Sequence, residues 1–402
     1  MTGVPDFPRP GLRITVGAVT TTTACVIPVF LVGGLAVQMG ADLDFSPAGL
    51  GLAVAVYFAA SALSSVPAGA LVEHLGARTT ARAGIAISAG CLVAIALAAR
   101  TYPVLVALLA AGAVANSLGQ LASNAALSQV RARRRGVSFG LKQAAIPAAT
   151  LLAGMSVPAL GLTLGWRWAF GGAALAAAAA WPLVAPGPPG RRTAAPAGGS
   201  GRPHGDTATG ALAVIGAAVA LGAGAAGALG IFLVDSAVDR GIAPGLAGLT
   251  LALGSVACIA GRVGAGWLAD RRRAHGDLFT VVVQFVVGAG GLALLAVPGE
   301  AALLVGVLLG FGFGWAFPGL VNFAVVQLHP HAPAGATSIT QTGVYAGGFV
   351  GPLVFGSAAA TVGYPATWLS AAAVLLVAAM LMLVARRMLR ERTARTRPRP
   401  AV

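Results

Sequence analysis

Arg262 has the clearest capacity for chemistry in this chain, because it lies inside a long apolar stretch. It precedes Asp270, at the end of that stretch, by eight residues. On a helix it therefore lies about 12 Å deeper, at about 1.5 Å per residue. A buried guanidinium can hold a carboxylate by two parallel hydrogen bonds. It can equally be tied to backbone carbonyls or to an acid near the helix end, and the sequence leaves both interpretations open.

Amide and aromatic side chains in other apolar stretches are candidates to line a solute cavity. Asn116, Gln120 and Asn124 are spaced four residues apart, so they share one face of a helix. The other candidates are Lys142, Gln143, Asn322, Gln341, Tyr57 and Tyr345. Each has an alternative role. Amides also hold membrane helices together for about 1 kcal/mol each, Lys142 is shallow enough to snorkel, and the tyrosines suit packing or an interface.

The acidic residues avoid the middle of the apolar stretches. Asp42, Asp44, Asp235, Asp239 and Glu300 all fall in loops or at predicted helix ends. Burial is what raises the pKa of a carboxyl group into a range useful for carrying protons. Asp235 and Asp239 are the best remaining proton carriers, with a solvated loop as the competing explanation, so proton coupling stays undecided.

The chain shows no constellation typical of an enzyme or a metal site. The histidines are scattered, and His329 and His331 provide only two potential ligands. No glycine-rich loop ends in Lys-Ser or Lys-Thr, which argues against an ATP-driven pump. Cys25, Cys91 and Cys258 lie in apolar stretches without metal-ligand spacing. We expect no enzymatic activity, no cofactor and no metal.

The elements that must position these residues are membrane helices. Hydrophobic residues make up 57% of the 402 and charged residues only 9%, whereas about a quarter of a soluble domain is charged. Apolar stretches near 20 residues recur, each long enough to cross a hydrocarbon layer about 30 Å thick. Stretches such as 211–234 are apolar on every face, which excludes the alternation of a transmembrane β-barrel.

The breaks between apolar stretches predict twelve transmembrane helices in an all-α membrane protein. They lie near residues 14–37, 47–72, 81–99, 103–129, 138–160, 166–184, 211–234, 244–269, 278–297, 301–328, 338–360 and 367–385. The corresponding divisions are an N-terminal six-helix bundle (1–185), a linker (186–210), a C-terminal six-helix bundle (211–385) and a basic tail (386–402). The linker is rich in Pro, Gly, Ser and Arg, a composition that does not bury enough apolar surface to fold.

The basic residues set the orientation. Alternating the loops between two sides puts all but three of the 26 Lys and Arg residues on one side, the exceptions being Arg100, Arg167 and Arg240. Basic short loops stay cytoplasmic, so we expect a cytoplasmic-membrane protein with both termini and the linker inside. The net charge of +15 thus follows the membrane and does not indicate nucleic acid. The expected partners are the lipid bilayer and a small-molecule substrate, and we expect a monomer.

The two halves repeat one another at a nearly fixed offset. Two sets of matches carry this: Gly69, Leu71 and Glu73 recur 197 residues later as Gly266, Leu268 and Asp270, and Asn124, Gln129 and Gln143 recur 198 residues later as Asn322, Gln327 and Gln341. Polar identities in register favour a true duplication. Parallel six-helix repeats related by an axis along the membrane normal are a known plan of transporters, with the solute site between them.

Each half carries the same loop motif after its second helix. In this motif a small residue is followed four residues later by an acid and then by basic residues. Its members are Gly69, Glu73, Gly76 and Arg78 in the first half and Gly266, Asp270 and Arg271 in the second. This resembles the loop signature of the major facilitator superfamily, Gly-x-x-x-Asp-basic-x-Gly-basic. With twelve predicted helices and a central linker, the resemblance covers essentially the whole chain. It implies two pseudo-symmetric bundles and a cytoplasmic gate formed by these residues, although Glu73 and His74 depart from the pattern.

The resemblance implies a secondary transporter and narrows its branch. A single arginine in the eighth helix, here Arg262, also occurs in anion-carrying branches, including those for monocarboxylates. The drug/proton antiporter signature Gly-x-x-x-Gly-Pro of the fifth helix is incomplete here, since that helix reads Leu152-Ala-Gly154-Met-Ser-Val-Pro158. We therefore expect transport of an organic anion by alternating access. The alternatives are an efflux pump for hydrophobic compounds, and a membrane receptor or scaffold that does not transport.

Overall fold

Helices are the only regular elements in the part of the chain that the structure describes. The computed structural model describes residues 10–128, 140–184, 206–272, 278–328 and 333–396. Within these ranges no strand occurs, as expected for a chain whose backbone polar groups must pair internally in lipid. The protein is thus an all-α membrane protein, as the composition predicts.

The first half contains α1 (Pro10–Gly34), α2 (Ala36–Leu43), α3 (Pro47–Ala98), α4 (Tyr102–Ser128), α6 (Ala145–Ser156), the π-helical turn η1 (Val157–Gly161), α7 (Trp166–Ala179) and the 3₁₀ turn η2 (Trp181–Leu183). The second half contains α8 (Asp206–Gly227), α9 (Leu229–Asp239), α10 (Pro244–Arg272), α11 (Phe279–Leu294), α12 (Glu300–Leu309), the π-helical turn η3 (Gly310–Gly314), α13 (Pro318–Leu328) and α14 (Pro333–Thr396).

The two longest helices each turn at a glycine. Gly76 within α3 has φ 82° and Gly363 within α14 has φ 80°, a conformation that costs glycine little and other residues more. The hydroxyl of Thr80 donates to the carbonyls of Leu71 and Gly76 and so closes the first turn. Eight described helices are long and apolar enough to cross a membrane, including these two. Dividing α3 and α14 at their glycines and adding α7 and α11 is consistent with twelve segments, a count that remains a prediction.

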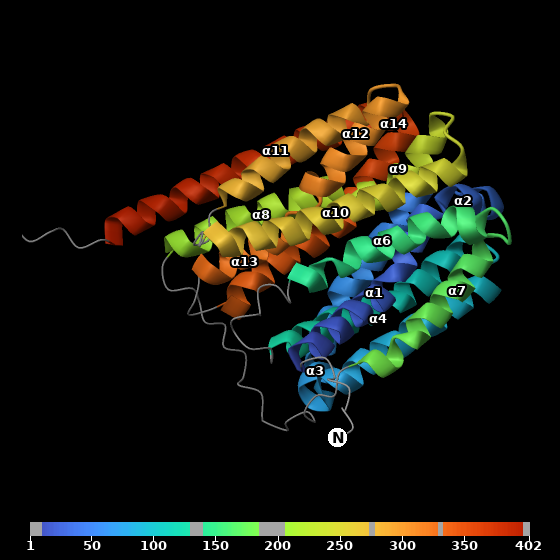
Figure 1. Cartoon of the computed structure of the whole chain (residues 1–402), viewed down its shortest axis with the longest axis horizontal. Helices are drawn as coiled ribbons and strands as arrows, with labels where there is room; N and C mark the ends of the chain where they lie inside the picture. The colour runs from blue at the N-terminus through green and yellow to red at the C-terminus, as the bar shows by residue number, and fades with distance from the viewer. Residues whose placement is uncertain (1–9, 129–139, 185–205, 273–277, 329–332, 397–402) are drawn as a thin grey trace, which may run out of the picture.

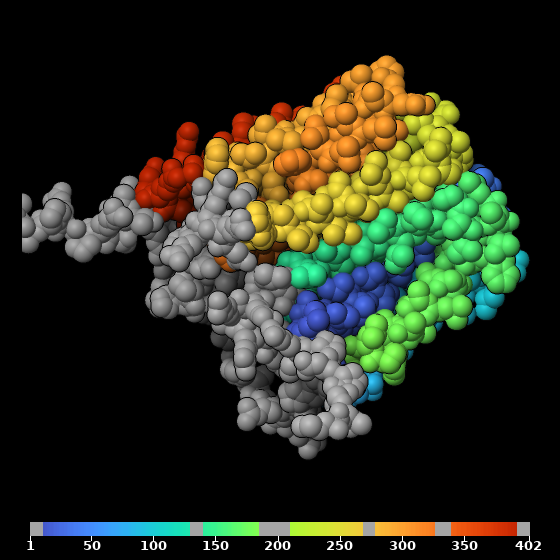
Figure 2. Space-filling model, viewed as in Figure 1, coloured from blue at the N-terminus to red at the C-terminus, as the bar shows by residue number. Residues whose placement is uncertain are grey.

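The halves lie side by side along their length (Figure 1). The most extensive contacts between them are those of α3 with α14, α6 with α10, and α1 with α9. Figure 2 shows α6 in green directly against α10 in yellow on one face of the molecule. We call the end where α3 turns at Gly76 and α10 ends at Arg272 the motif end, and the end where α2 and α9 finish the far end.

The internal repeat extends to the backbone. Asp44, the only described non-glycine residue with positive φ, lies 197 residues before Gly241, which also has positive φ. Gly165 and Gly363 share positive φ at an offset of 198. The offsets are those of the sequence matches, so the turns at the far end recur with the helices that they connect.

Some helix bounds differ from those expected. Helix α8 begins at Asp206 instead of residue 211, and α14 continues to Thr396, through most of the predicted tail. Arg, Met, Leu and Glu dominate residues 386–392, and all four favour helix. Residues 186–205 of the predicted linker and the basic loop around Arg131 lie outside the described residues.

Candidate functional site

Two seams of close helix contact join the halves. In the α3–α14 seam, a Cβ placed on Gly51 would lie 2.2 Å from the carbonyl oxygen of Pro352. In the α6–α10 seam, a Cβ on Gly154 would lie 2.6 Å from the carbonyl oxygen of Gly248. Both contacts lie toward the far end, and backbones approach this closely only where a side chain is missing. The far end is therefore closed between the halves.

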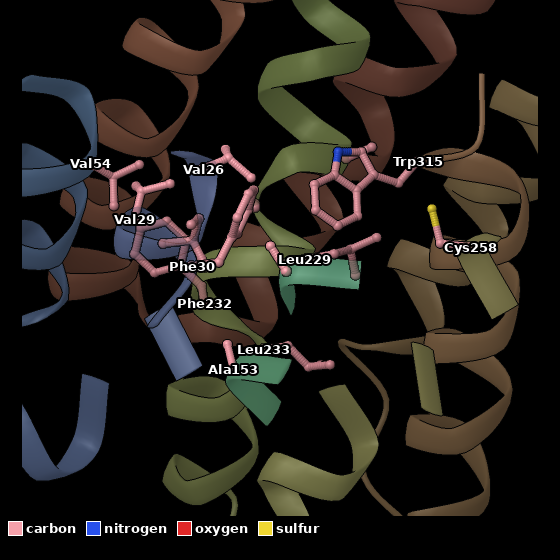
Figure 3. Close-up of a cluster of buried hydrophobic side chains, with 14 of the residues drawn as sticks. Val26, Val29, Phe30, Val54, Ala153, Leu229, Phe232, Leu233, Cys258 and Trp315 are labelled. Carbon is pink, nitrogen blue, oxygen red and sulfur yellow. The ribbon is translucent and has the colours of Figure 1, made fainter. Parts of the chain in front are cut away.

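An apolar cluster drawn from both halves lies between these seams. Figure 3 shows Phe30 and Val54 of the first half near Leu229, Phe232 and Trp315 of the second. The rings of Phe30 and Trp315 meet edge to face with centroids 5.8 Å apart. All these residues are buried, so the cluster closes the path along the molecular axis toward the far end.

A cavity adjoins this cluster, with an empty volume of about 1000 Å³ that includes space continuous with solvent. Both halves line it. Its polar lining consists of Gln120, Gln143, Arg262, Asn322, Thr340, Gln341 and Tyr345, and its apolar lining includes Phe30, Phe58, Trp315 and Phe317. No Asp or Glu occurs among the described lining residues. A concave site that is mainly apolar with a few convergent polar groups is the usual form of a small-molecule site.

Arg262 is 4% exposed and joins the halves. One terminal nitrogen of its guanidinium donates to the backbone carbonyl of Gln143 in the first half, and the other donates to that of Trp315 at 2.9 Å. The Nε atom is buried without an oxygen or nitrogen partner, and the thiol of Cys258 lies within hydrogen-bonding reach of the guanidinium. The guanidinium also lies 5.8 Å from the centroid of the Trp315 ring. Of the two interpretations of Arg262, the observed contacts fit a tie to carbonyls.

The sequence explains why these two carbonyls are available. In a regular helix the carbonyl of Gln143 would accept from residue 147, which is Pro147 and has no N–H. Trp315 lies in the non-helical turn between η3 and α13, where the helical ladder is interrupted. Exposed carbonyls at broken helices are common where a membrane protein lines a cavity.

Lys142 is the second buried cation of this region, at 3% exposure. Its ammonium donates to the side-chain oxygen of Gln120, a lining residue on α4. Neither Lys142 nor Arg262 forms an ion pair with a described residue. The site therefore presents uncompensated positive charge near the cavity.

The remaining candidates divide between the cavity and the interior of a half. Asn322 accepts from Thr340 at 3.1 Å, and both line the cavity with Gln341 and Tyr345. Four candidates do not line it: Asn116, Asn124, Tyr57 and Lys142, the last of which contacts the lining residue Gln120. Asn116 donates to Ser61 on α3, and Tyr57 is fully buried and donates to the carbonyl of Cys25. In this structure the contacts of Asn116 and Tyr57 connect helices within the first half.

The gate motif forms no hydrogen bond or ion pair between the halves among the residues described. Glu73 and Arg78 are exposed, and no atom lies within 4 Å of a Cβ placed on Gly69 or Gly266. The side chains of Asp270 and Arg271 lie outside the described residues. A gate role for the motif stays a prediction.

The acidic candidates lie at the far end. The hydroxyl of Tyr364 donates to the half-buried Asp235, and Asp239 is exposed. In the first half, Asp42 pairs with Arg167 at 2.6 Å and accepts from the indole of Trp166 at 3.0 Å. These bonds, first that of Arg167, lower the pKa of Asp42 below 3.8. Both pairs connect the end of one helix to the start of another.

Sequence reasoning missed several residues of the cavity. Trp315, Phe30, Phe58 and Thr340 line it without having been singled out. A signal for Trp315 existed: Gly310, Gly312 and Gly314 precede it and Pro318 follows it, a combination that interrupts a membrane helix. Phe30 and Phe58 are ordinary apolar residues in sequence, so only packing assigns them to the cavity.

The matches to known proteins agree with this geometry. The family model described as Major Facilitator Superfamily matches residues 18–352. The chain belongs to the major facilitator superfamily.

Solved structures of superfamily transporters share its fold. A D-xylose-proton symporter aligns with TM-score 0.72 at 16% identity, covering 93% of this chain and 97% of its own. A bacterial homologue of the human lysosomal transporter Spinster, inward-facing and unoccupied, aligns with TM-score 0.71 at 15% identity, covering 98% and 100%. At these identities the likeness shows the fold alone. As a superfamily member, the protein is a secondary transporter and not an enzyme.

Proposed function

We propose that this superfamily member moves a small organic anion across the cytoplasmic membrane by alternating access, with the two halves rocking about the central cavity. The supporting observation is the pair of buried cations, Arg262 and Lys142, beside a cavity whose described lining contains no acid. Buried charge without a counter-charge is costly. A bound carboxylate offsets that cost, whereas a neutral or cationic solute does not.

The cavity also has places for the rest of such a solute. Trp315 and Phe58 offer apolar surface, and Gln120, Gln143, Asn322 and Gln341 offer hydrogen bonds from both halves. A solute held by groups from both halves couples its binding to their relative position. Joint binding of one solute by both halves is the physical basis of alternating access here.

The motif end faces the cytosol in this proposal, because the loops richest in Lys and Arg lie there. The far end is closed by the two seams and the apolar cluster. The described state is then inward-facing, with a single chain in the lipid bilayer as the transporting unit and a small molecule as its partner.

The test is uptake into liposomes that contain the purified protein, with benzoate, lactate and gluconate offered beside benzamide. We expect carboxylate transport, and a loss of about a hundredfold in Arg262→Ala, since truncating one partner of a buried charge pair costs several kcal/mol. Arg262→Lys retains charge but loses the paired donors, so it recovers only part. Arg82→Ala removes a cation that lies over Trp181 away from the cavity, and serves as the control. Undiminished uptake in Arg262→Ala would remove Arg262 from the mechanism.

A second candidate is export of hydrophobic compounds. Both terminal nitrogens of Arg262 are occupied by carbonyls, and aromatic and aliphatic side chains form most of the lining. The two proposals differ in what Arg262 does. If the protein is an exporter of this kind, cells that overproduce it resist apolar toxicants, and Arg262→Ala leaves that resistance unchanged.

A further inference from the structure

Pro28 inside α1 and Pro147 in the first turn of α6 each leave a carbonyl four residues earlier without its helical donor, and in both cases another helix supplies a substitute. Pro28 in α1 leaves the carbonyl of Ala24, to which the hydroxyl of Ser88 donates at 2.6 Å. Pro147 in α6 leaves the carbonyl of Gln143, to which Arg262 donates. The first bond lies within one half. The second joins the two halves beside the solute cavity.

The bond at Gln143 is of a kind that an anion can replace. A neutral carbonyl accepts from a guanidinium less strongly than a carboxylate does, because a carboxylate adds the attraction between opposite charges and can accept two parallel bonds. A carboxylate bound in the usual way needs two neighbouring N–H groups. Both terminal nitrogens of Arg262 are already engaged, and Nε has no oxygen or nitrogen partner beside the thiol of Cys258. A carboxylate that takes Nε and a terminal nitrogen therefore competes with a carbonyl for the same group.

We propose that Arg262 is a solute-released tie between the halves and that Pro147 is the positioning residue that makes the tie possible. This inference rests on the proposed anion transport. Without solute, Arg262 holds α10 to the first half through Gln143. A solute carboxylate draws the guanidinium away from that carbonyl, and the seam loses its bond at the level of the cavity.

The release has a direct consequence for transport. Among the described residues, the hydroxyls of Thr150 and Ser255, which lie 2.7 Å apart, then remain as a polar bond of the α6–α10 seam. Gln143 lines a cavity that is continuous with solvent. Water can therefore bond to its carbonyl after Arg262 leaves, so that losing the bond to Arg262 costs little. Solute binding thereby lowers the barrier to rocking on one seam, and the empty carrier is held back.

Pro147→Ala tests the tie, because alanine restores the N–H that a helix directs at the carbonyl of Gln143. Arg262 then no longer has to be removed from that carbonyl. We expect the Kd of benzoate to fall about tenfold, with benzamide binding unchanged, as measured by titration calorimetry on the purified protein. We expect the maximal rate of uptake to rise by less than this tenfold gain in affinity. A merely structural role of Pro147 predicts weaker or unchanged binding, and either result in a folded variant overturns the proposal.

Pro28→Ala is the matched control, since it restores the same donor inside one half. It is expected to leave benzoate affinity unchanged, and an equal gain in both variants would contradict the tie. Spin labels on Leu141→Cys and Trp267→Cys report the tie without any solute, because both native positions are exposed and the three native cysteines are buried. We expect Pro147→Ala, and not Pro28→Ala, to lengthen and broaden the label distance. If no carboxylate binds the native protein but the label distance changes in Pro147→Ala, the anion proposal fails and the tie stands. If carboxylates are transported but Pro147→Ala changes neither the distance nor the affinity, the tie alone fails.

Discussion

The two seams between the halves occupy equivalent places in the internal repeat, yet different kinds of interaction stabilise them. Gly51 and Gly248 are repeat mates, and each meets its neighbour across the interface at the far end. Toward the cavity the seams diverge. In the α3–α14 seam the ring of Phe58 lies against Gly348, whereas in the α6–α10 seam the repeat mates of these residues, Ser255 and Thr150, share a hydrogen bond.

The divergence continues at the cavity itself. The repeat mate of Arg262 is Ser65, whose hydroxyl donates to the carbonyl of Ala62 on its own helix and does not cross to the other half. The described contacts between α3 and α14 are thus steric and apolar, with a bond from Tyr345 of α14 to Ser117 of α4 beside them, whereas polar bonds join α6 and α10 directly. Dispersion contacts weaken gradually as helices separate, whereas a hydrogen bond is made or broken. The duplication fixes where the helices meet, and the later substitutions decide which seam can respond to a polar solute.

Adding a methyl group to the α3–α14 seam should have the largest effect. The Cβ of Gly51→Ala would lie 2.2 Å from the carbonyl oxygen of Pro352, against 2.7 Å from that of Gly154 for Gly248→Ala. Overpacking of this kind costs about 1–3 kcal/mol. We expect both variants to unfold at lower temperature and to lose transport, Gly51→Ala more severely, in thermal unfolding assays in detergent.

Gly90→Ala is the control for this prediction, because no atom lies within 4 Å of a Cβ placed there. Alanine is favoured over glycine inside a helix by up to about 1 kcal/mol, so this variant should be unchanged or slightly more stable. Equal stability of all three variants would mean that the seams are looser than the contacts described.

The polar seam is tested by a double-mutant cycle on Thr150→Val and Ser255→Ala. Interhelical hydrogen bonds in membrane proteins couple by about 0.6 kcal/mol on average and at most about 1.7, and we expect a coupling in that range. Transport rates should change as well, since the bond joins the halves. The pair Thr22 and Ser123, 3.1 Å apart within the first half, should show coupling in stability without a matching change in transport rate. A similar change in transport from both pairs would remove the distinction between the seams.

The smallest effect is expected at the far end, where each half has an acidic residue but the two acids have different partners. Asp42 pairs with the cation Arg167, whereas Asp235 accepts from the neutral Tyr364. The pKa of Asp42 is lowered from 3.8, first by Arg167. Its ion pair therefore stabilises the protein above that ordinary value, and the stabilisation is lost as pH falls through the lowered pKa.

Because the pair is largely exposed, Asp42→Asn should cost less than about 1 kcal/mol at pH 7. The difference in melting temperature from the native protein should shrink as pH falls below about 4 and also as salt rises. A difference that grew on acidification would show that the carboxylate is not the stabilising form.

The amino-acid sequence by itself determined that this protein lies in a lipid bilayer and that it consists of two repeated bundles. Long apolar stretches require helices in a bilayer, and the recurrence of Gly69, Asn124 and Gln143 in the second half indicates a duplicated bundle. Both inferences depend on residue type and spacing along one helix, which a sequence records directly. It also located Arg262, because a charge in an apolar stretch is costly wherever the helix lies. The membership in the superfamily followed from the same features and is confirmed.

The tertiary structure alone decided which polar residues share a cavity. Gln120, Asn322 and Gln341 line it, whereas Asn116, on the same helix face as Gln120, bonds to Ser61 inside one half. Helix periodicity gives a residue's face but not what that face meets. Likewise, Pro147 and Arg262 are each visible in the sequence, but nothing along the chain brings the carbonyl at residue 143 to a guanidinium on another bundle. That contact arises only because two glycine seams set the distance between the halves, and distance between segments is a property of packing and not of local sequence.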